Sequence, residues 1–235
     1  MVILLTIFLI AGGVFLFQRY LVKKEISSEQ DISSLSTPRL NLTTTKLATI
    51  PKDWEPKFWL FSSCGRKIAY VAEKDRKESV AINDEMGKKY NKVFFFEFSP
   101  DGKRFVYVAI DGGKCFVVVD GKEGKRYDWV SIPQFSPDSQ KLIYIAEEKG
   151  KQFVVVNGKE RERYDSIAAL PQFSPDSQKF AYLGKKEEEW FVIVKDEEDR
   201  RYYNYDDIDL DLEFNPESQK YYILIEGDYV EVEKY

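Results

Sequence analysis

The stretch FSPDGKRFVYVA, residues 98–109, decides the fold of this 235-residue chain. Its first half is a tight-turn sequence, because proline presets φ, aspartate bonds the backbone ahead of it and glycine accepts a positive φ. Its second half alternates and clusters aromatic and β-branched residues, which is typical of a strand. Together the two halves predict a strand that ends at Phe98, a tight turn and a second strand.

The same pattern occurs five times along the chain. Its phenylalanines are spaced 37, 37, 38 and 41 residues apart and are Phe61, Phe98, Phe135, Phe173 and Phe214. A basic residue follows every one of them by six positions, and a tyrosine follows the first four by nine positions. Self-similarity at a fixed period of this length is the signature of a repeat architecture.

Each repeat predicts four short antiparallel strands. In the second repeat they are the strand that ends at Phe98, the strands 105–109 and 116–119, and a short segment at 126–128. Asp120-Gly121 marks a hairpin turn, because both residues tolerate a positive φ. Four strands in a repeat of about 40 residues make one blade of a β-propeller. The predicted fold class is therefore all-β, a five-bladed β-propeller of four-stranded antiparallel blades.

The ends of the chain predict how the ring closes. The fifth repeat has strand candidates at 221–225 and 229–232 but no fourth strand, while residues 46–51 are a strand candidate without a blade. Pairing the two would close the ring with an N-terminal strand and hide two sheet edges. The alternative is an open array of five repeats that completes itself by dimerisation.

The turn sequence FSPDGK, followed by an apolar strand with a tyrosine, resembles the WD40-like repeats of TolB-type propellers, often called PD40 repeats. The resemblance covers roughly residues 58–225 and is specific for the fold rather than for a function. It implies an exported bacterial domain that acts as a binding platform. The chain departs from TolB because it has no separate N-terminal α/β domain and five repeats in place of six, so a Tol–Pal role is not implied.

Residues 1–22 predict a transmembrane helix, either a retained anchor or an uncleaved signal. Residues 1–17 carry no charge, and extension to Val22 gives a helix long enough to cross a bilayer. Residues 23–45 predict a Ser/Thr-rich linker, and residues 46–235 the propeller. The basic residues after the apolar stretch favour a cytoplasmic propeller, whereas an anchor, polar stalk and propeller in series are typical of exported domains. We expect a single-pass membrane protein whose propeller is extracytoplasmic.

Composition narrows the chemistry that the chain can perform. It contains no histidine, which excludes Ser-His-Asp and Cys-His nucleophile systems and histidine-ligated metals. A net charge of −5, with Lys and Glu interleaved, argues against a nucleic-acid partner. Cys64 and Cys115 form no CxxC motif and predict free thiols. We expect no catalytic residue, no metal and no cofactor.

One set of candidate contact residues precedes the repeat phenylalanines directly. On the inner strands of a propeller these positions predict a polar ring near the central channel, formed by Glu97, Gln134, Gln172 and Glu213. The first repeat has Leu60 at this position. The simplest interpretation is packing that the repeat encodes, polar because the channel is wet.

The second set of candidates is the acidic run that contains Asp207, Asp209 and Asp211. Closely spaced carboxylates can ligate calcium or serve as the acid–base pair of a glycosidase. Their alternation with Ile208 and Leu210 fits a plain strand with one apolar face better. An acidic face on an inner strand still departs from the blade pattern, and such departures tend to be functional.

The sequence thus predicts a membrane-anchored, non-enzymatic propeller that binds a protein or another ligand at the cell envelope. The partner is expected to be an unknown protein or envelope component. The N-terminal helix is expected to hold the chain in the membrane. A carboxylate-dependent, glycosidase-like five-bladed propeller and a purely structural envelope component are the alternatives. Repeat length varies most at 195–205, which predicts an exposed loop there on the side that meets a partner.

Overall fold

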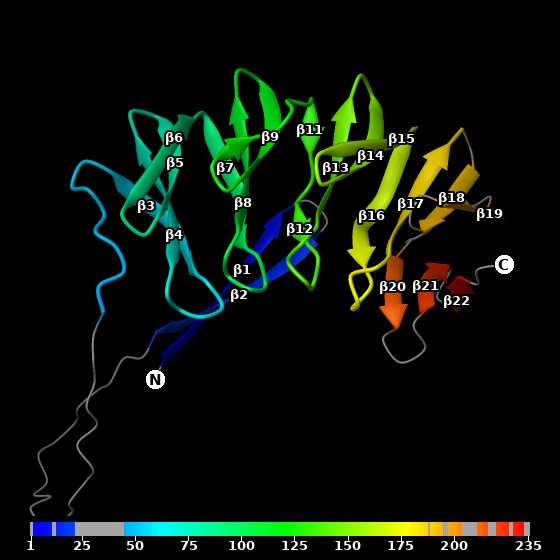
Figure 1. Cartoon of the computed structure of the whole chain (residues 1–235), viewed down its shortest axis with the longest axis horizontal. Helices are drawn as coiled ribbons and strands as arrows, with labels where there is room; N and C mark the ends of the chain where they lie inside the picture. The colour runs from blue at the N-terminus through cyan, green and yellow to red at the C-terminus, as the bar shows by residue number, and fades with distance from the viewer. Residues whose placement is uncertain are drawn as a thin grey trace, which may run out of the picture. The chain divides into compact units, whose positions relative to one another are not determined.

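The computed structural model describes the backbone of residues 2–10, 13–21, 45–187, 189–194, 197–203, 211–215, 220–225 and 228–232. The chain divides into two compact units, residues 1–44 and 45–235. Within the described ranges every regular element is a β-strand, as Figure 1 shows. The all-β fold class is therefore confirmed.

The N-terminal unit contains a β-hairpin. Strand β1 (Val2–Ile10) pairs antiparallel with β2 (Gly13–Leu21) along their full lengths. The helix predicted over residues 1–22 is not confirmed, because strands occupy most of this stretch. The sequence there is rich in valine, isoleucine and phenylalanine, which favour extended backbone as well as membrane. Among the described residues no helix has the length and apolar character needed to span a bilayer.

The second unit contains five antiparallel sheets in chain order, one for each sequence repeat (Figure 1). Blade 1 contains β3 (Glu55–Phe61), β4 (Ile68–Lys74), β5 (Lys77–Ile82) and β6 (Glu85–Tyr90). Blade 2 contains β7 (Lys92–Phe98), β8 (Phe105–Asp111), β9 (Lys114–Val119) and β10 (Lys122–Glu123). In blade 3 the first strand is split into β11 (Trp129–Val130) and β12 (Gln134–Phe135), followed by β13 (Leu142–Glu148), β14 (Lys151–Val156) and β15 (Lys159–Tyr164).

Blade 4 contains β16 (Ser166–Phe173), β17 (Phe180–Lys186), β18 (Glu189–Val194) and β19 (Glu197–Tyr203). Blade 5 has three described strands, β20 (Asp211–Asn215), β21 (Lys220–Ile225) and β22 (Asp228–Val232). Four-stranded antiparallel blades are thus confirmed for the first four repeats. Residues 197–203 form a strand, although the sequence predicts an exposed loop there. These residues pair with β18, which completes the sheet.

The hairpin between the third and fourth strands has the predicted geometry. Asp120 and Gly121 have φ values of 51° and 77°, and Asn157 and Gly158 have 49° and 78°. Two successive positive φ values match the right-handed twist of the flanking strands. The fourth strand therefore begins directly after this turn, earlier than the predicted segment at 126–128.

The tight turn after each inner strand also joins neighbouring blades. In blade 2, Ser99 Oγ donates to Asp101 Oδ1 at 2.6 Å, which together with backbone N–H donors lowers the pKa of this carboxyl to about 2. The N–H of Asp101 donates to Ser139 Oγ in the turn of blade 3 at 3.1 Å. The N–H of Asp138 donates to Ser177 Oγ in blade 4 at 3.0 Å. The aspartates therefore have structural roles, and the turns of blades 2, 3 and 4 are bonded in series.

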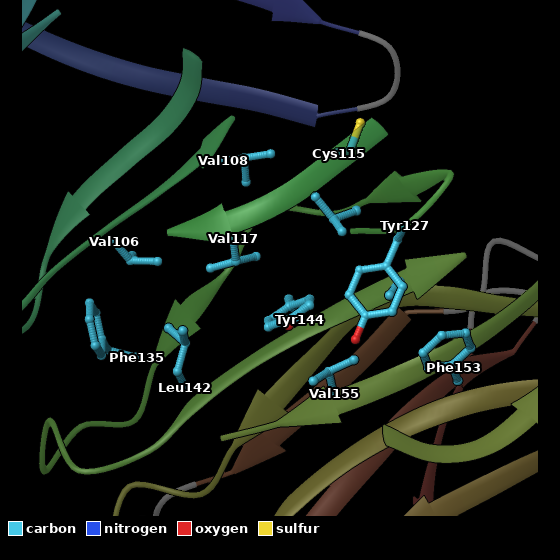
Figure 2. Close-up of a cluster of buried hydrophobic side chains, with 12 residues drawn as sticks. Val106, Val108, Cys115, Val117, Tyr127, Phe135, Leu142, Tyr144, Phe153 and Val155 are labelled. Carbon is cyan, nitrogen blue, oxygen red and sulfur yellow. The ribbon is translucent and has the colours of Figure 1, made fainter. Parts of the chain in front are cut away.

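The core lies between successive blades. Figure 2 shows one such cluster, in which valines from β8 and β9 lie together with Leu142 and Tyr144 of β13 and Phe153 of β14. Similar clusters of buried apolar side chains join blade 1 to blade 2 and blade 3 to blade 4. Because the middle strands of a blade are covered on both faces, they are apolar on both faces.

Residues 45–54 do not provide the predicted closing strand. They form no strand, and Ala48 and Trp54 pack on apolar side chains of β4 and β5. The N–H of Thr49 donates to Asp84 Oδ1 at 2.7 Å, which also holds the segment on blade 1. The prediction that residues 46–51 pair with the fifth blade is therefore wrong. The physical reason is that blade 1 has no preceding blade in the chain to cover its outer apolar face, and this segment covers part of it.

Candidate functional site

The first strand of each blade lies at an edge of its sheet, and we call these strands the inner strands. They are β3, β7, β11 with β12, β16 and β20. An edge strand exposes backbone N–H and C=O groups and one row of side chains to whatever lies beside it. In a propeller this edge faces the central channel. A binding site is therefore expected on the inner strands.

The residues predicted to form a polar ring occupy one register position. Each lies opposite the residue nine positions further along the chain, in the pairs Glu97–Val106, Gln134–Ile143, Gln172–Ala181 and Glu213–Tyr222. The repeat therefore does place these four backbone positions equivalently in four blades. The side chains of Gln134 and Gln172 are half-buried, and that of Glu97 is exposed. The side chain of Glu213 lies outside the described residues.

Glu97 is the ring residue with the most unusual environment. Within the part of the chain that the structure describes, its carboxylate makes no hydrogen bond and no ion pair. The surrounding protein nevertheless removes enough water to raise the pKa of this carboxyl. Desolvation without a compensating cation destabilises the ionised form. Glu97 is therefore a carboxylate that a cationic group would stabilise.

The acidic run is only partly within the described residues. Asp211 begins β20 and lies opposite Leu224, which agrees with a strand in this region. Asp207 and Asp209 lie outside the described residues. Elsewhere in the described ranges no three potential metal ligands come together. The calcium and glycosidase alternatives remain predictions from the sequence.

A β-bulge interrupts β7 just before Glu97. The pairing register shifts between Phe94 and Glu97, and Phe95 has a φ of +48°. Phe94 packs against the core shared with blade 3, whereas Phe96 packs against the core shared with blade 1. Phe95 is thus the inserted residue and belongs to neither core. A positive φ in a bulky residue costs of order 1–3 kcal/mol, and such strain clusters at functional sites.

The bulge is a property of the repeat, but its residues differ between blades. In blade 1 the inserted residue is Lys57, between the paired residues Pro56 and Phe58. In blade 3 the inner strand breaks between β11 and β12, and in blade 4 the register shifts between Ala168 and Gln172. Bulges re-aim side chains and are common beside binding sites. Every blade from 1 to 4 therefore presents its own set of side chains at this level.

Exposed aromatic residues gather on the inner strands. Apart from Ile50, the large apolar side chains that are exposed in the described residues are Phe58, Trp59, Phe61, Phe95 and Trp129, on β3, β7 and β11. A large apolar side chain that stays exposed is available to a binding partner. Sequence reasoning missed this surface, although the run Phe94-Phe95-Phe96 breaks the alternation of a strand and is the signal for a bulge.

The lysines closest to this surface are already engaged by Glu78, a buried residue of β5. Its carboxylate accepts hydrogen bonds from Lys57 Nζ at 2.9 Å, Lys92 Nζ at 2.8 Å and the N–H of Val93 at 2.8 Å. Burial opposes ionisation, but the two lysines and the N–H outweigh it and lower the pKa of Glu78. Hydrogen bonds to Glu73 and Glu78 raise the pKa of Lys57 to about 12.

The two cysteines are free thiols, as predicted. Cys64 is exposed in the turn of blade 1, and Cys115 is buried on β9. A hydrogen bond with Ser62 lowers the pKa of Cys64, whereas burial raises that of Cys115. The two thiols are therefore expected to differ in reactivity.

No protein-family model and no curated protein matches the chain. Among solved structures it is similar to TolB from Acinetobacter baumannii, with 16% identity and a TM-score of 0.43 over 73% of this chain and 53% of that chain. It is also similar to an oligogalacturonate lyase in complex with manganese, with 9% identity and a TM-score of 0.48 over 75% of this chain and 64% of that chain.

A third similar structure is the β-propeller domain of the Trilobed protease from Pyrococcus furiosus, with 12% identity and a TM-score of 0.44 over 77% of this chain and 69% of that chain. The chain spans about half of TolB and just under two thirds of the lyase. These proteins differ in activity, so the likeness speaks only to fold. The chain is thus similar in fold to β-propeller proteins, TolB among them.

Proposed function

We propose that this protein is a non-enzymatic binding module of the cell envelope, which takes up its ligand on the exposed side chains of the inner strands. The observation that carries this proposal is Phe95, a bulky residue held at a positive φ and 36% exposed. Backbone strain and the exposed part of the ring both cost stability, and the aromatic contact that the ring makes is with Phe94, at 6.0 Å between centroids. Presentation of the ring to a partner explains both costs.

A binding role fits the remaining chemistry better than an enzymatic one. The sequence has no histidine, and Glu97 is a single carboxylate beside aromatic residues rather than one of a described pair. A glycosidase needs two carboxyl groups at a defined separation. Similarity in fold to both TolB and a lyase does not distinguish a binding role from an enzymatic one. The proposal therefore rests on the side chains of the inner strands.

A photo-crosslinking amino acid at position 95 of the full chain tests the proposal in native membranes. We expect one defined protein adduct from position 95 and none from position 122, which is exposed on β10 of the same blade. The adduct should persist when Asp207, Asp209 and Asp211 are all changed to Asn, because these carboxylates serve no catalysis in this proposal. No adduct at position 95 would refute a binding role for the inner strands.

We further propose that residues 1–22 anchor the chain in a membrane and that the blades lie outside the cytoplasm. The apolar sequence of residues 1–17, followed by a polar linker, supports this arrangement. A reporter fused after Tyr235 that is active only outside the cytoplasm is the expected result. Activity of a cytoplasmic reporter alone would reverse the orientation, and recovery of the chain without membranes would remove the anchor.

We also propose that the five blades form a closed ring in which blade 5 covers the outer face of blade 1. The support is a comparison of equivalent residues: Phe98 and Phe135 are 7% and 9% exposed under the preceding blade, whereas Phe61 is 56% exposed. All three lie at the same repeat position and face the preceding blade. Among the described residues no blade covers Phe61, and closure of the ring would bury it as the preceding blade buries its two counterparts.

A further inference from the structure

The second residue of the third strand joins its blade to the next blade. In blade 1, Glu78 Oε2 accepts a hydrogen bond from the N–H of Val93 on the inner strand of blade 2, at 2.8 Å. In blade 3, Gln152 Oε1 accepts the equivalent bond from the N–H of Ile167 in blade 4, also at 2.8 Å. Blade 2 has Cys115 at this repeat position. The bond between blades is therefore made equally well by a carboxylate and by a neutral amide.

Glu78 differs from its counterparts because it also holds two lysines. Its other oxygen, Oε1, accepts hydrogen bonds from Lys57 Nζ at 2.9 Å and from Lys92 Nζ at 2.8 Å. At the junction of blades 3 and 4, the repeat positions of these lysines hold Ser131 and Ser166. Glu78 is only 4% exposed, and burial of a carboxylate is costly unless it is paired. The charge of Glu78 therefore serves the two lysines rather than the bond to the next blade.

Both lysines belong to inner strands that contain a β-bulge. Lys57 is the residue inserted in β3, and Phe58, which follows it, is 52% exposed. Lys92 begins β7, whose register shifts at Phe95. Because a bulge leaves residues outside the hydrogen-bonded ladder, contacts of side chains have to fix its direction. One buried carboxylate thus connects the bulge that precedes Phe58 to the strand that carries Phe95.

We propose that Glu78 is a positioning residue of the binding surface, which holds Lys57 and Lys92 and thereby fixes the inner strands that expose Phe58 and Phe95. This inference rests on the proposed function and names the group that keeps its aromatic side chains in place. Glu78 is itself buried, so contact with the partner is left to the exposed rings. A departure from the repeat beside a binding surface is where a functional role is expected.

The first test uses the full chain in detergent with 4-fluorophenylalanine at position 58 or 95, observed by fluorine NMR. We expect one narrow resonance at each position when Glu78 is intact. Glu78→Gln should shift, broaden or split both resonances, because glutamine keeps the bond to the next blade and releases the two lysines. Lys57→Met should alter position 58 alone, and Lys92→Met should alter position 95 alone. A role of Glu78 in stability alone would not produce this pattern.

Gln152→Ala is the matched control, because it breaks the equivalent bond between blades 3 and 4 and leaves Lys57 and Lys92 bonded to Glu78. It should leave both resonances unchanged, although it also costs stability. Unchanged resonances in Glu78→Gln, or changes of equal size in Gln152→Ala, would overturn the inference.

The photo-crosslinked adduct at position 95 provides the second test, because it reports binding in native membranes. Glu78→Gln should lower the yield of this adduct at least about threefold, whereas Gln152→Ala should keep it near the yield of the unaltered chain. An undiminished yield in Glu78→Gln would refute this inference while the binding function stands. Absence of any adduct from the chain with Glu78 intact would refute the proposed function, and the fluorine resonances would still decide whether Glu78 fixes the two strands.

Discussion

Replacement of Phe61 by alanine, measured beside Phe98→Ala, decides whether blade 1 has a neighbour on its outer face. A phenylalanine side chain has about 200 Å² of surface to bury. With exposed fractions of 7% and 56%, about 190 Å² is buried at Phe98 and about 90 Å² at Phe61. At about 25 cal/mol per Å², truncation should cost about 4.5 kcal/mol at Phe98 and about 2 kcal/mol at Phe61 if that face stays open. A closed ring would bury Phe61 as deeply as Phe98, so we expect both variants to lose about 4 kcal/mol.

Urea unfolding of the full chain in detergent, followed by tryptophan fluorescence, measures the two losses. Phe135→Ala serves as a second reference, because Phe135 is 9% exposed. A loss near 2 kcal/mol for Phe61→Ala, with unchanged m-values, would refute ring closure. Stability that rises with protein concentration would show that a second copy, rather than blade 5, covers the face.

Three further predictions concern Glu78, Gly184 and the two cysteines. Glu78→Gln should cost about 1 kcal/mol and Glu78→Ala about 3 kcal/mol in the same unfolding assay, because glutamine keeps the backbone hydrogen bond and loses only the ion pairs. The pKa of Glu78 is lowered below 4.5. The contribution of ionised Glu78 to the free energy of unfolding should therefore be complete above pH 4.5 and fall as the pH drops through the folded-state pKa. The Glu78→Gln variant should lack this pH dependence. Gly184→Ala should lose about 1–3 kcal/mol, because a Cβ there would lie 2.5 Å from the ring of Tyr164; no loss would mean that the ring shifts freely. Cys64 should react with a thiol reagent in the folded protein and Cys115 only in urea, so equal native labelling would contradict the assigned burial.

The sequence was sufficient to predict the blades because local and non-local signals agree in them. The FSPDG turn at 98–102 and the Asp120-Gly121 hairpin fix the ends of strands, and the apolar runs between them are covered on both faces. The polar ring could be predicted as a set of register positions, because a strand position follows directly from the distance to the repeat phenylalanine. Its chemistry could not, since the absence of a cation at Glu97 depends on where Lys92 and Arg104 find their partners.

The predictions that the structure does not confirm concern stretches whose sequence fits two environments. The apolar residues 2–10 and 13–21 are compatible with a membrane helix and with a β-hairpin, because their apolar character fits a membrane span and their β-branched residues favour strands. The segment before blade 1 is compatible with a closing strand and with a cover for an open sheet face. Trp54 favours the second, because it packs on apolar side chains of blade 1. The bulge at Phe95 was not predicted, because three consecutive phenylalanines are also compatible with a regular strand that is apolar on both faces.

The serine that the turns of blades 3 and 4 each offer to the turn before them has a consequence for how such a chain can grow or shrink. Asp101 bonds Ser139, and Asp138 bonds Ser177, with the same atoms in the same repeat positions. Excision of residues 102–138 would leave Asp101 facing Ser177, a partner it already has the geometry to meet. Duplication or loss of one whole repeat within blades 2 to 4 would therefore preserve the hydrogen bond between the turns that become neighbours.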